Sequence, residues 1–203
     1  MQAMTEPVVD YRDLAQLDTH VDHIRNAPST VGTVDLIVSR QAHAERTVLD
    51  TATLDLDQGL AGDSWSQRPS RNGPDGGPDP DSQLNIMSSR AIAAIAGDKE
   101  HWHHAGDQFF LDVDLSHDNL PTGTRLRLGD EAVIEITAKS HNGCAKFRGR
   151  YGLDAMRWVN GPAGKELRIR GLCAKVIVPG IVHRDDKVVV VMRLTDAWSP
   201  SRA

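Results

Sequence analysis

The sequence predicts a mostly β fold (β-rich, α+β), in which an antiparallel, barrel-like bent sheet is decorated by three or four helices. Short runs with a β-type pattern recur along most of the chain, and we count about eight of them. Most segments between these runs are too short for the crossover that joins parallel strands. Only 4% of the 203 residues are aromatic, so the core is expected to be aliphatic.

Length and composition favour one globular domain with short additions at its ends. Apolar residues make up 39% of the chain and charged residues 25%, which is ordinary for a globular protein. We assign residues 1–30 to an N-terminal helical extension, 31–194 to the β-rich domain and 195–203 to a tail. Within the extension, residues 8–27 carry apolar side chains at helical spacing: Leu14, Leu17, Val21 and Ile24. Such a helix is expected to pack on the main body or on a second subunit of a homodimer.

The predicted strands follow from alternating or continuous apolar runs bounded by turn residues. Two of these turns are expected at Gly129-Asp130-Glu131, which joins a hairpin, and at Pro179-Gly180, which ends the longest strand. In order, the strands are Thr33–Ser39, Thr47–Leu56, Leu84–Met87, Phe109–Leu115, Thr124–Leu128, Ala132–Thr137, Leu167–Val178 and Lys187–Leu194.

Two further helices and one long loop complete the predicted order. Ser88 or Ser89 is expected to cap a helix over Arg90–Ala96, which Gly97 closes. Tyr151–Val159 is the second helix, and the glycines and proline of residues 161–164 are expected to break it. Residues 64–82 are rich in Ser, Arg, Pro, Gly and Asp and predict a long structureless loop, either simply mobile or a lid over a site.

Charge and hydropathy limit the classes of partner that we expect for this protein. The net charge is −5, yet residues 146–170 hold seven cations and two acids, a local charge of +5 against −10 elsewhere. An acidic protein is a poor non-specific nucleic-acid binder, so we expect no nucleic-acid partner. The local excess fits a small anionic ligand, or else a solvated basic face. The N-terminus lacks the pattern of a secretory signal and no run is long enough to span a membrane, which predicts a cytoplasmic protein with no membrane partner.

The segment from His141 to Arg150 holds one of the two cysteines, Cys144, directly after an Asn-Gly pair that is typical of a tight bend. The bend is expected to expose the thiol at the end of a strand. Neighbouring cations and free backbone N–H groups stabilise a thiolate, so Cys144 is a candidate working thiol. The alternative is an inert, buried cysteine. For Cys173, which lies inside a predicted strand, the inert interpretation is favoured.

Other chemistries find little support. The segment His101-Trp102-His103-His104 could bind a metal, but its spacing matches no metalloprotease helix and no carboxylate completes a facial triad, so a polar helix surface is expected. The sequence contains no GxSxG nucleophile elbow and no phosphate-binding P-loop.

Several blocks of the sequence together resemble the MOSC domain (molybdenum cofactor sulfurase C-terminal domain), as a stand-alone bacterial-type member. The most specific block is His141-Asn142-Gly143-Cys144-Ala145-Lys146-Phe147 with Arg150-Tyr151-Gly152-Leu153-Asp154-Ala155. The others are Gly59-Leu60-Ala61-Gly62-Asp63, the stretch from Leu115 to Gly129, and Arg170-Gly171-Leu172-Cys173-Ala174-Lys175-Val176. The resemblance covers roughly residues 31–194.

The resemblance implies a β-barrel-like fold and the molybdenum cofactor (molybdopterin), with Cys144 as the catalytic residue and molybdenum ligand. It places the other cofactor-binding residues at His141, Lys146, Arg148, Arg150, Gly62, Asp63 and Arg170, with Arg168 as a further candidate cation. The pyridoxal-phosphate domain of the eukaryotic sulfurases does not fit into 203 residues, so pyridoxal phosphate is not expected in this chain.

Three functions remain open from the sequence. The first is a molybdenum-dependent oxidoreductase that reduces N-hydroxylated substrates with a redox partner protein. The second is a sulfurtransferase-like sulfur carrier with a persulfide on Cys144, supplied by a donor such as a cysteine desulfurase. The third is a non-catalytic binding module with an inert cysteine.

Overall fold

The computed structural model describes residues 9–41 and 45–193, and in it seven strands close into a barrel. The strand order is β11-β7-β8-β9-β5-β6-β1, and β11 pairs with β1 to complete the circle. Within these residues only β5 and β6 pair in parallel, and the chain between them runs through helix α3. The barrel confirms the predicted β-rich fold with mostly antiparallel strands.

The strands are β1 (Val31–Ser39), β2 (Thr47–Leu49), β3 (Thr51–Asp55), β4 (Gly59–Leu60), β5 (Leu84–Ser88), β6 (Phe109–Asp112), β7 (Arg125–Leu128), β8 (Ala132–Ile136), β9 (Leu172–Val178), β10 (Gly180–His183) and β11 (Lys187–Met192). The α-helices are α1 (Leu14–Asp18), α2 (Val21–Arg25), α3 (Ser89–Ala96), α4 (Ala145–Asn160) and α5 (Pro162–Glu166). Four 3-10 turns lie between them: η1 (Ser64–Gln67), η2 (Pro74–Gly76), η3 (Pro80–Ser82) and η4 (Lys99–Ala105).

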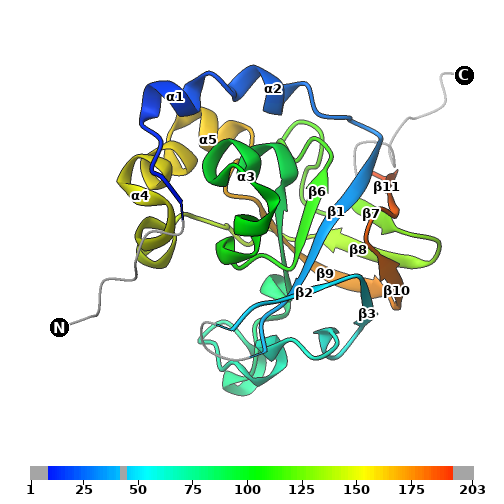
Figure 1. Cartoon of the computed structure of the whole chain (residues 1–203). Coiled ribbons are helices and arrows are strands. Elements are labelled where there is room, and N and C mark those ends of the chain that lie inside the picture. Colours follow the sequence, from blue (N-terminus) through cyan, green and yellow to red (C-terminus); the bar gives the residue numbers. More distant parts are fainter. Residues whose placement is uncertain (1–8, 42–44, 194–203) are drawn as a thin grey trace, which may run out of the picture.

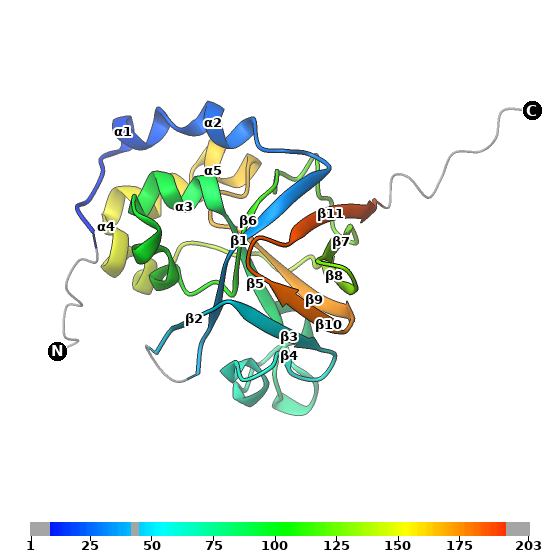
Figure 2. The same cartoon turned by 45° about the vertical axis from the view of Figure 1, so that its right-hand side comes forward.

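The helices gather on one side of the barrel, and strand β6 shows how the two layers share one strand (Figures 1 and 2). Its Phe109 and Leu111 belong to the apolar cluster inside the barrel. Phe110 points the other way and packs in a second cluster with residues of α1, α3 and α4. Because successive side chains of a strand face opposite sides, one short strand serves both cores.

The predicted strand Thr47–Leu56 is in fact two strands in different sheets. Strand β2 pairs with β1 of the main sheet, whereas β3 pairs with β10 and β4 in a separate three-stranded sheet. The chain must turn at Asp50 to change partners, and the apolar pattern does not report which partner a strand takes.

The N-terminal helix predicted over residues 8–27 is divided into α1 and α2. Asp13 begins α1 with a capping box that it forms with Gln16. The hydroxyl of Thr19 bonds the carbonyl of Gln16 and helps to end the helix after one turn. Leu17 and Ile24 are buried and Val21 is partly buried, but Leu14, the fourth residue of the predicted apolar face, is exposed. Residue 8 lies outside the described residues.

The prediction that residues 64–82 are structureless was wrong, because three 3-10 turns form there. Asp63 and Asp79 cap two of these turns by accepting backbone N–H groups. The Trp65 side chain is buried, and its Nε1 donates to the carbonyl of Asp79 at 3.2 Å. Short polar side chains that cap turns are also abundant in disordered loops, so composition alone could not tell these two states apart.

Three boundaries near the cysteine also differ from the prediction. Helix α4 begins at Ala145 rather than Tyr151, and α5 forms where a helix break was expected. Pro162 at the start of α5 explains this, since proline is well tolerated in the first turn of a helix. Residues 167–171 complete the turn after α5, so strand β9 begins only at Leu172 and β1 is the longest strand.

None of the helices in residues 9–41 and 45–193 is both long enough and apolar enough to cross a lipid bilayer.

Gly171 is the point of closest approach between the start of β9 and strand β5, and it supplies the first test. Its φ is +104°, and a Cβ added there would lie 2.0 Å from the carbonyl oxygen of Ile86. We expect Gly171→Ala to lower the free energy of unfolding by about 2–5 kcal/mol, through backbone strain and overpacking. Gly62→Ala is the matched control, because its φ is +81° with nothing within 4 Å, and should cost only about 1–2 kcal/mol. Equal losses in urea unfolding would contradict the steric explanation.

Candidate functional site

Cys144 lies at the N-cap position of α4, and its side chain is exposed. Its backbone is extended (φ −123°), and the thiol makes no capping hydrogen bond. The expected bend at a strand end was therefore wrong: Gly143 has no positive φ, and the thiol stands where a helix begins. The free N–H groups of a helix start face this position and favour an anion there.

Helix α4 folds back on itself, and this fixes the segment before Cys144. Its backbone breaks at Gly152, where φ is +92° and ψ is 171°. The second half then brings Asn160 beside Gly143, whose N–H donates to Oδ1 at 3.0 Å while Nδ2 donates to its carbonyl at 3.2 Å. A Cβ added at Gly143 would lie only 2.7 Å from Cγ2 of Val159, so a glycine suits this position. Asn160 thus holds Gly143, the residue before the thiol, in place through two hydrogen bonds.

A buried ion network lies beneath the cysteine loop, which we define as residues 137–144. The carboxylate of Asp107 accepts from Nε2 of His141 at 2.7 Å and from Arg170 at 2.8 and 3.0 Å. The Asp107 side chain is fully buried, and the Arg170 side chain is 7% exposed. The guanidinium of Arg170 also stacks over the ring of Phe147 at 4.9 Å. Three segments of the chain therefore meet at one carboxylate.

The network sets the protonation of its members. Burial raises the pKa of Asp107, but the charge of Arg170 and then His141 outweighs burial and lowers the pKa to about 2. Burial and the charge of Arg170 lower the pKa of His141, so the imidazole is neutral at pH 7. An ionised carboxylate only accepts, so Nε2 of His141 carries the proton and Nδ1 is left as an acceptor.

Three arginines bind the backbone of the loop that precedes β6. Arg150 donates to the carbonyl of His104 at 2.6 Å. Arg170 donates to the carbonyl of Ala105 and Arg40 to that of Gly106, each at 3.4 Å. Residues 104–107 thereby connect the Asp107 network to the cations around it.

These cations form what we call the arginine cluster: Arg40, Arg46, Arg68 and Arg150. Burial, and then the charges of Arg150, Arg40 and Arg68, lower the pKa of Arg46 to about 10. Arg46 and Arg150 both lie against Gly106, and the buried Nε of Arg46 has no hydrogen-bond partner among the described residues. The cluster is a concentration of positive charge that lacks an equal number of carboxylates.

Asp63 is the carboxylate of the predicted glycine-aspartate loop, and it holds Arg40. Its oxygens accept the N–H, Nε and second terminal amine of Arg40 at 2.8, 3.0 and 2.9 Å, and the N–H of Trp65 at 2.9 Å. Those four bonds occupy the lone pairs of a carboxylate. A direct contact of Gly62 and Asp63 with a cofactor stays a prediction, while the observed contacts of Asp63 position Arg40.

The remaining predicted residues lie along α4. Lys146 and Arg148 are exposed in its first turn, and neither has an ion-pair partner in the part of the chain that the structure describes.

In the histidine segment, His103 and His104 face each other at 3.8 Å between ring centres, and burial and neighbouring positive groups lower the pKa of His104 to about 4. No group of three or more candidate metal ligands forms within the described residues.

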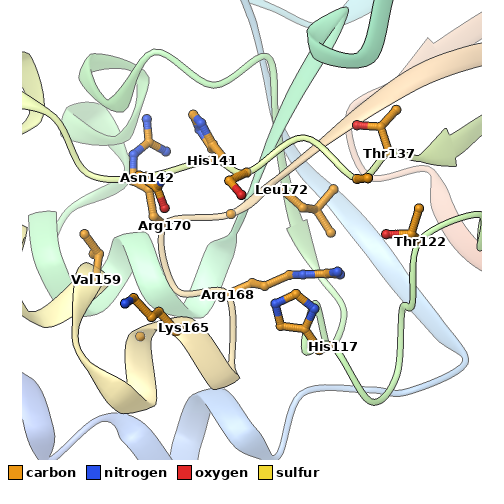
Figure 3. A pocket seen from close by; sticks show the side chains of 14 residues that line it. His117, Thr122, Thr137, His141, Asn142, Val159, Lys165, Arg168, Arg170 and Leu172 are labelled. Carbon is orange, nitrogen blue, oxygen red and sulfur yellow. The ribbon is translucent and has the colours of Figure 1, made fainter.

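A pocket of about 280 Å³ opens on the other side of the cysteine loop (Figure 3). His141 and Arg170 line it, but Figure 3 shows the Arg170 side chain rising away from Arg168 and His117. Cys144 is not among the lining residues. None of the arginines that form the arginine cluster lines it either.

Sequence reasoning missed the residues that organise the site, above all Asp107, Asn160 and Arg40. Asp107 is 34 residues from His141 and 63 from Arg170, and no local motif marks it. The one sequence signal is Gly106-Asp107 directly before an apolar strand, which is a common loop pattern. For Asn160 the signal would have been the length of the helix, which was drawn too short.

Substitution of Asp107 by Asn tests the buried network. We expect a loss of about 3–5 kcal/mol in the free energy of unfolding, because Arg170 is left as an uncompensated buried charge. Asp22→Asn, which breaks the exposed pair with Arg25, is the control and should cost less than about 0.5 kcal/mol.

The pH dependence follows from the lowered pKa of Asp107. Its contribution is complete above the unfolded pKa of 3.8 and is lost as the pH falls through the folded value of about 2. The difference between wild type and Asp107→Asn in urea unfolding should therefore shrink below pH 4. A difference that stays constant down to pH 2 would contradict this assignment.

The two thiols should differ sharply in reactivity. Cys173 is buried, and burial followed by the charge of Asp107 raises its pKa to about 12. With iodoacetamide at neutral pH, intact-mass analysis of the native protein should show one modification, absent in Cys144→Ser, and Cys173 should react only after denaturant is added. Equal labelling of both thiols in the folded protein would show that the exposure described here is wrong.

Comparisons with known proteins give structural neighbours and no sequence family. No family model matches the chain, and no curated protein matches it. YuaD from Bacillus subtilis superimposes with a TM-score of 0.53 at 17% identity, covering 78% of this chain and 94% of YuaD. A hypothetical protein gives 0.56 at 19%, covering 85% and 72% of the two chains. YiiM from Escherichia coli gives 0.51 at 20%, covering 80% and 71%. These neighbours show that the barrel and its helices have a MOSC-like fold.

Proposed function

We propose that this chain is a MOSC-domain protein that binds the molybdenum cofactor, with Cys144 as the ligand of molybdenum. One observation carries the proposal: an exposed, free thiol stands at the start of α4, three residues after His141 of the buried ion network and six residues before Arg150 of the arginine cluster. A soft thiolate suits molybdenum, and guanidinium groups suit a phosphate.

The donor set fits a cofactor that carries both a dithiolene and a phosphate. The buried Nε atoms of Arg46 and Arg170 have no partner among the described residues, so each can still donate. Asp63 is saturated by Arg40 and by the N–H of Trp65, which leaves Arg46, Arg68 and Arg150 without a carboxylate partner among residues 9–41 and 45–193. Lys146 and Arg148 add two exposed cations in the first turn of α4.

Each residue then has a defined part. Cys144 would hold the metal, and the arginine cluster with Lys146 and Arg148 would hold the phosphate. Arg170 and Asp107 orient His141, whose Nδ1 can accept a proton close to the thiol in the chain. When bound, molybdenum would supply the redox chemistry, and we propose reduction of N-hydroxylated substrates as the reaction class.

The exposure of Cys144 also favours a second candidate. A sulfur carrier must present its thiol to a donor protein, and a thiol at an exposed helix start meets that requirement. In that case Cys144 would bear a persulfide supplied by a cysteine desulfurase, and the same cations would bind the acceptor cofactor.

Metal content tests the first candidate. Protein from a host that makes the cofactor should contain close to one molybdenum per chain by elemental analysis, and Cys144→Ser should lose nearly all of it. Cys173→Ser is the matched control, because that thiol is buried in β9 and should leave the molybdenum content unchanged.

Wild-type protein without molybdenum from such a host would overturn the first candidate. Mass spectrometry after incubation with a cysteine desulfurase and cysteine would then decide the second, which requires one added sulfur atom on Cys144. An unmodified thiol would remove both candidates and favour a non-catalytic binding module.

A further inference from the structure

The pocket on the far side of the cysteine loop has a charge pattern that the proposed cofactor site does not explain. Its lining contains Lys165, Arg168 and His117 and not one carboxylate. These three side chains lie on the wall opposite the loop that carries His141 and Asn142 (Figure 3). Cys144, Lys146, Arg148 and Arg150 do not line it.

The charges of this wall are not neutralised from nearby. Lys165 and Arg168 have no ion-pair partner within residues 9–41 and 45–193, and Glu166, between them in sequence, is paired with Arg25 instead. Burial lowers the pKa of the Arg168 guanidinium, which shows that it is partly removed from water while it stays charged. Burial, and then Arg168, lower the pKa of His117, so this imidazole is neutral at pH 7 and contributes hydrogen bonds rather than charge.

Arg168 also stands in a conformation that does not suit it. It follows α5 with a φ of +47°, at the position of a Schellman motif that glycine normally occupies. The two bonds of the motif are present, from the N–H of Ile169 to the carbonyl of Gly164 at 2.8 Å and from the N–H of Arg168 to that of Lys165 at 3.3 Å. An arginine at this position carries a backbone strain that a glycine would not.

The side chain of Arg168 is held in place within the wall. One terminal nitrogen donates to the carbonyls of Leu120 and Leu115 at 2.6 and 3.4 Å. Its Nε and other terminal nitrogen make no bond to any described residue. A strained, oriented guanidinium with unused donors is what an anion site requires.

We propose that this pocket binds a phosphate monoester through Lys165 and Arg168, at a site that shares His141 and Arg170 with the proposed cofactor site but is lined neither by Cys144 nor by the arginine cluster. Two permanent cations without a carboxylate match a dianion better than a single carboxylate charge. About 280 Å³ leaves room for a small organic group beside the phosphate, against the apolar side chains of Val159, Leu172 and Ala138. The inference does not depend on molybdenum being bound.

The test uses the full chain and phenyl phosphate, followed by amide shifts in two-dimensional NMR. Saturable shifts are expected at Asn142 and Gly171, with benzyl alcohol giving none. Lys165→Gln and Arg168→Gln should each weaken binding about tenfold or more. Arg127→Gln, an exposed arginine on β7, and Cys144→Ser should bind as wild type does.

Arg168→Gly separates the binding role from a structural one. Glycine relieves the strain of the positive φ, which offsets the loss of the two hydrogen bonds from the side chain, so this variant should lose binding while its urea unfolding midpoint stays close to that of the wild type. The proposal is overturned if phenyl phosphate does not saturate below about 10 mM. It is also overturned if the pocket variants bind like Arg127→Gln, or if Cys144→Ser abolishes binding.

Discussion

The carboxylate of Asp107 joins three parts of the chain that are far apart in sequence. It binds His141 of the cysteine loop and Arg170 at the start of β9, and it belongs to the loop that precedes β6. All three groups are largely removed from water, where an unpaired charge is costly, so the Asp107 carboxylate and the Arg170 guanidinium require each other. The buried carboxylate of Asp107 therefore holds the cysteine loop in place through His141.

The second constraint comes from α4, which holds the same loop from the side. Its reversal at Gly152 returns Asn160 to Gly143, the residue before the thiol. A Cβ at Gly152 would lie 2.8 Å from the ring of Tyr11, so the reversal and the N-terminal segment also depend on each other. Held from two directions, Cys144 is exposed at a helix start, whereas Cys173 is buried in β9. The same residue type therefore differs in exposure at the two positions.

Buried carboxylates determine which arginines of this acidic protein are neutralised. Asp63 engages Arg40, and Asp107 engages Arg170, so the two most buried arginines are neutralised and act as structure. Arg46, Arg68 and Arg150 of the arginine cluster, and Lys165 and Arg168 of the pocket, have no ion-pair partner among the described residues. These two groups of cations are the basis of the two anion sites that we propose.

The sequence by itself determined the strand-rich barrel, the spacing of Leu17 and Ile24 in the N-terminal extension, and the local basic excess around Cys144, because these depend on side chains near one another in the chain. It did not determine where β2 and β3 part, that residues 64–82 fold into short turns, or that α4 begins at the cysteine. Only the tertiary structure decided which cations are neutralised: Arg170 is paired with Asp107, while Lys165 and Arg168 line the same pocket without an ion-pair partner among the described residues. The reason is physical. A charge is recognised from the sequence, but whether it is neutralised depends on partners brought from 34 to 63 residues away by the closing of the barrel.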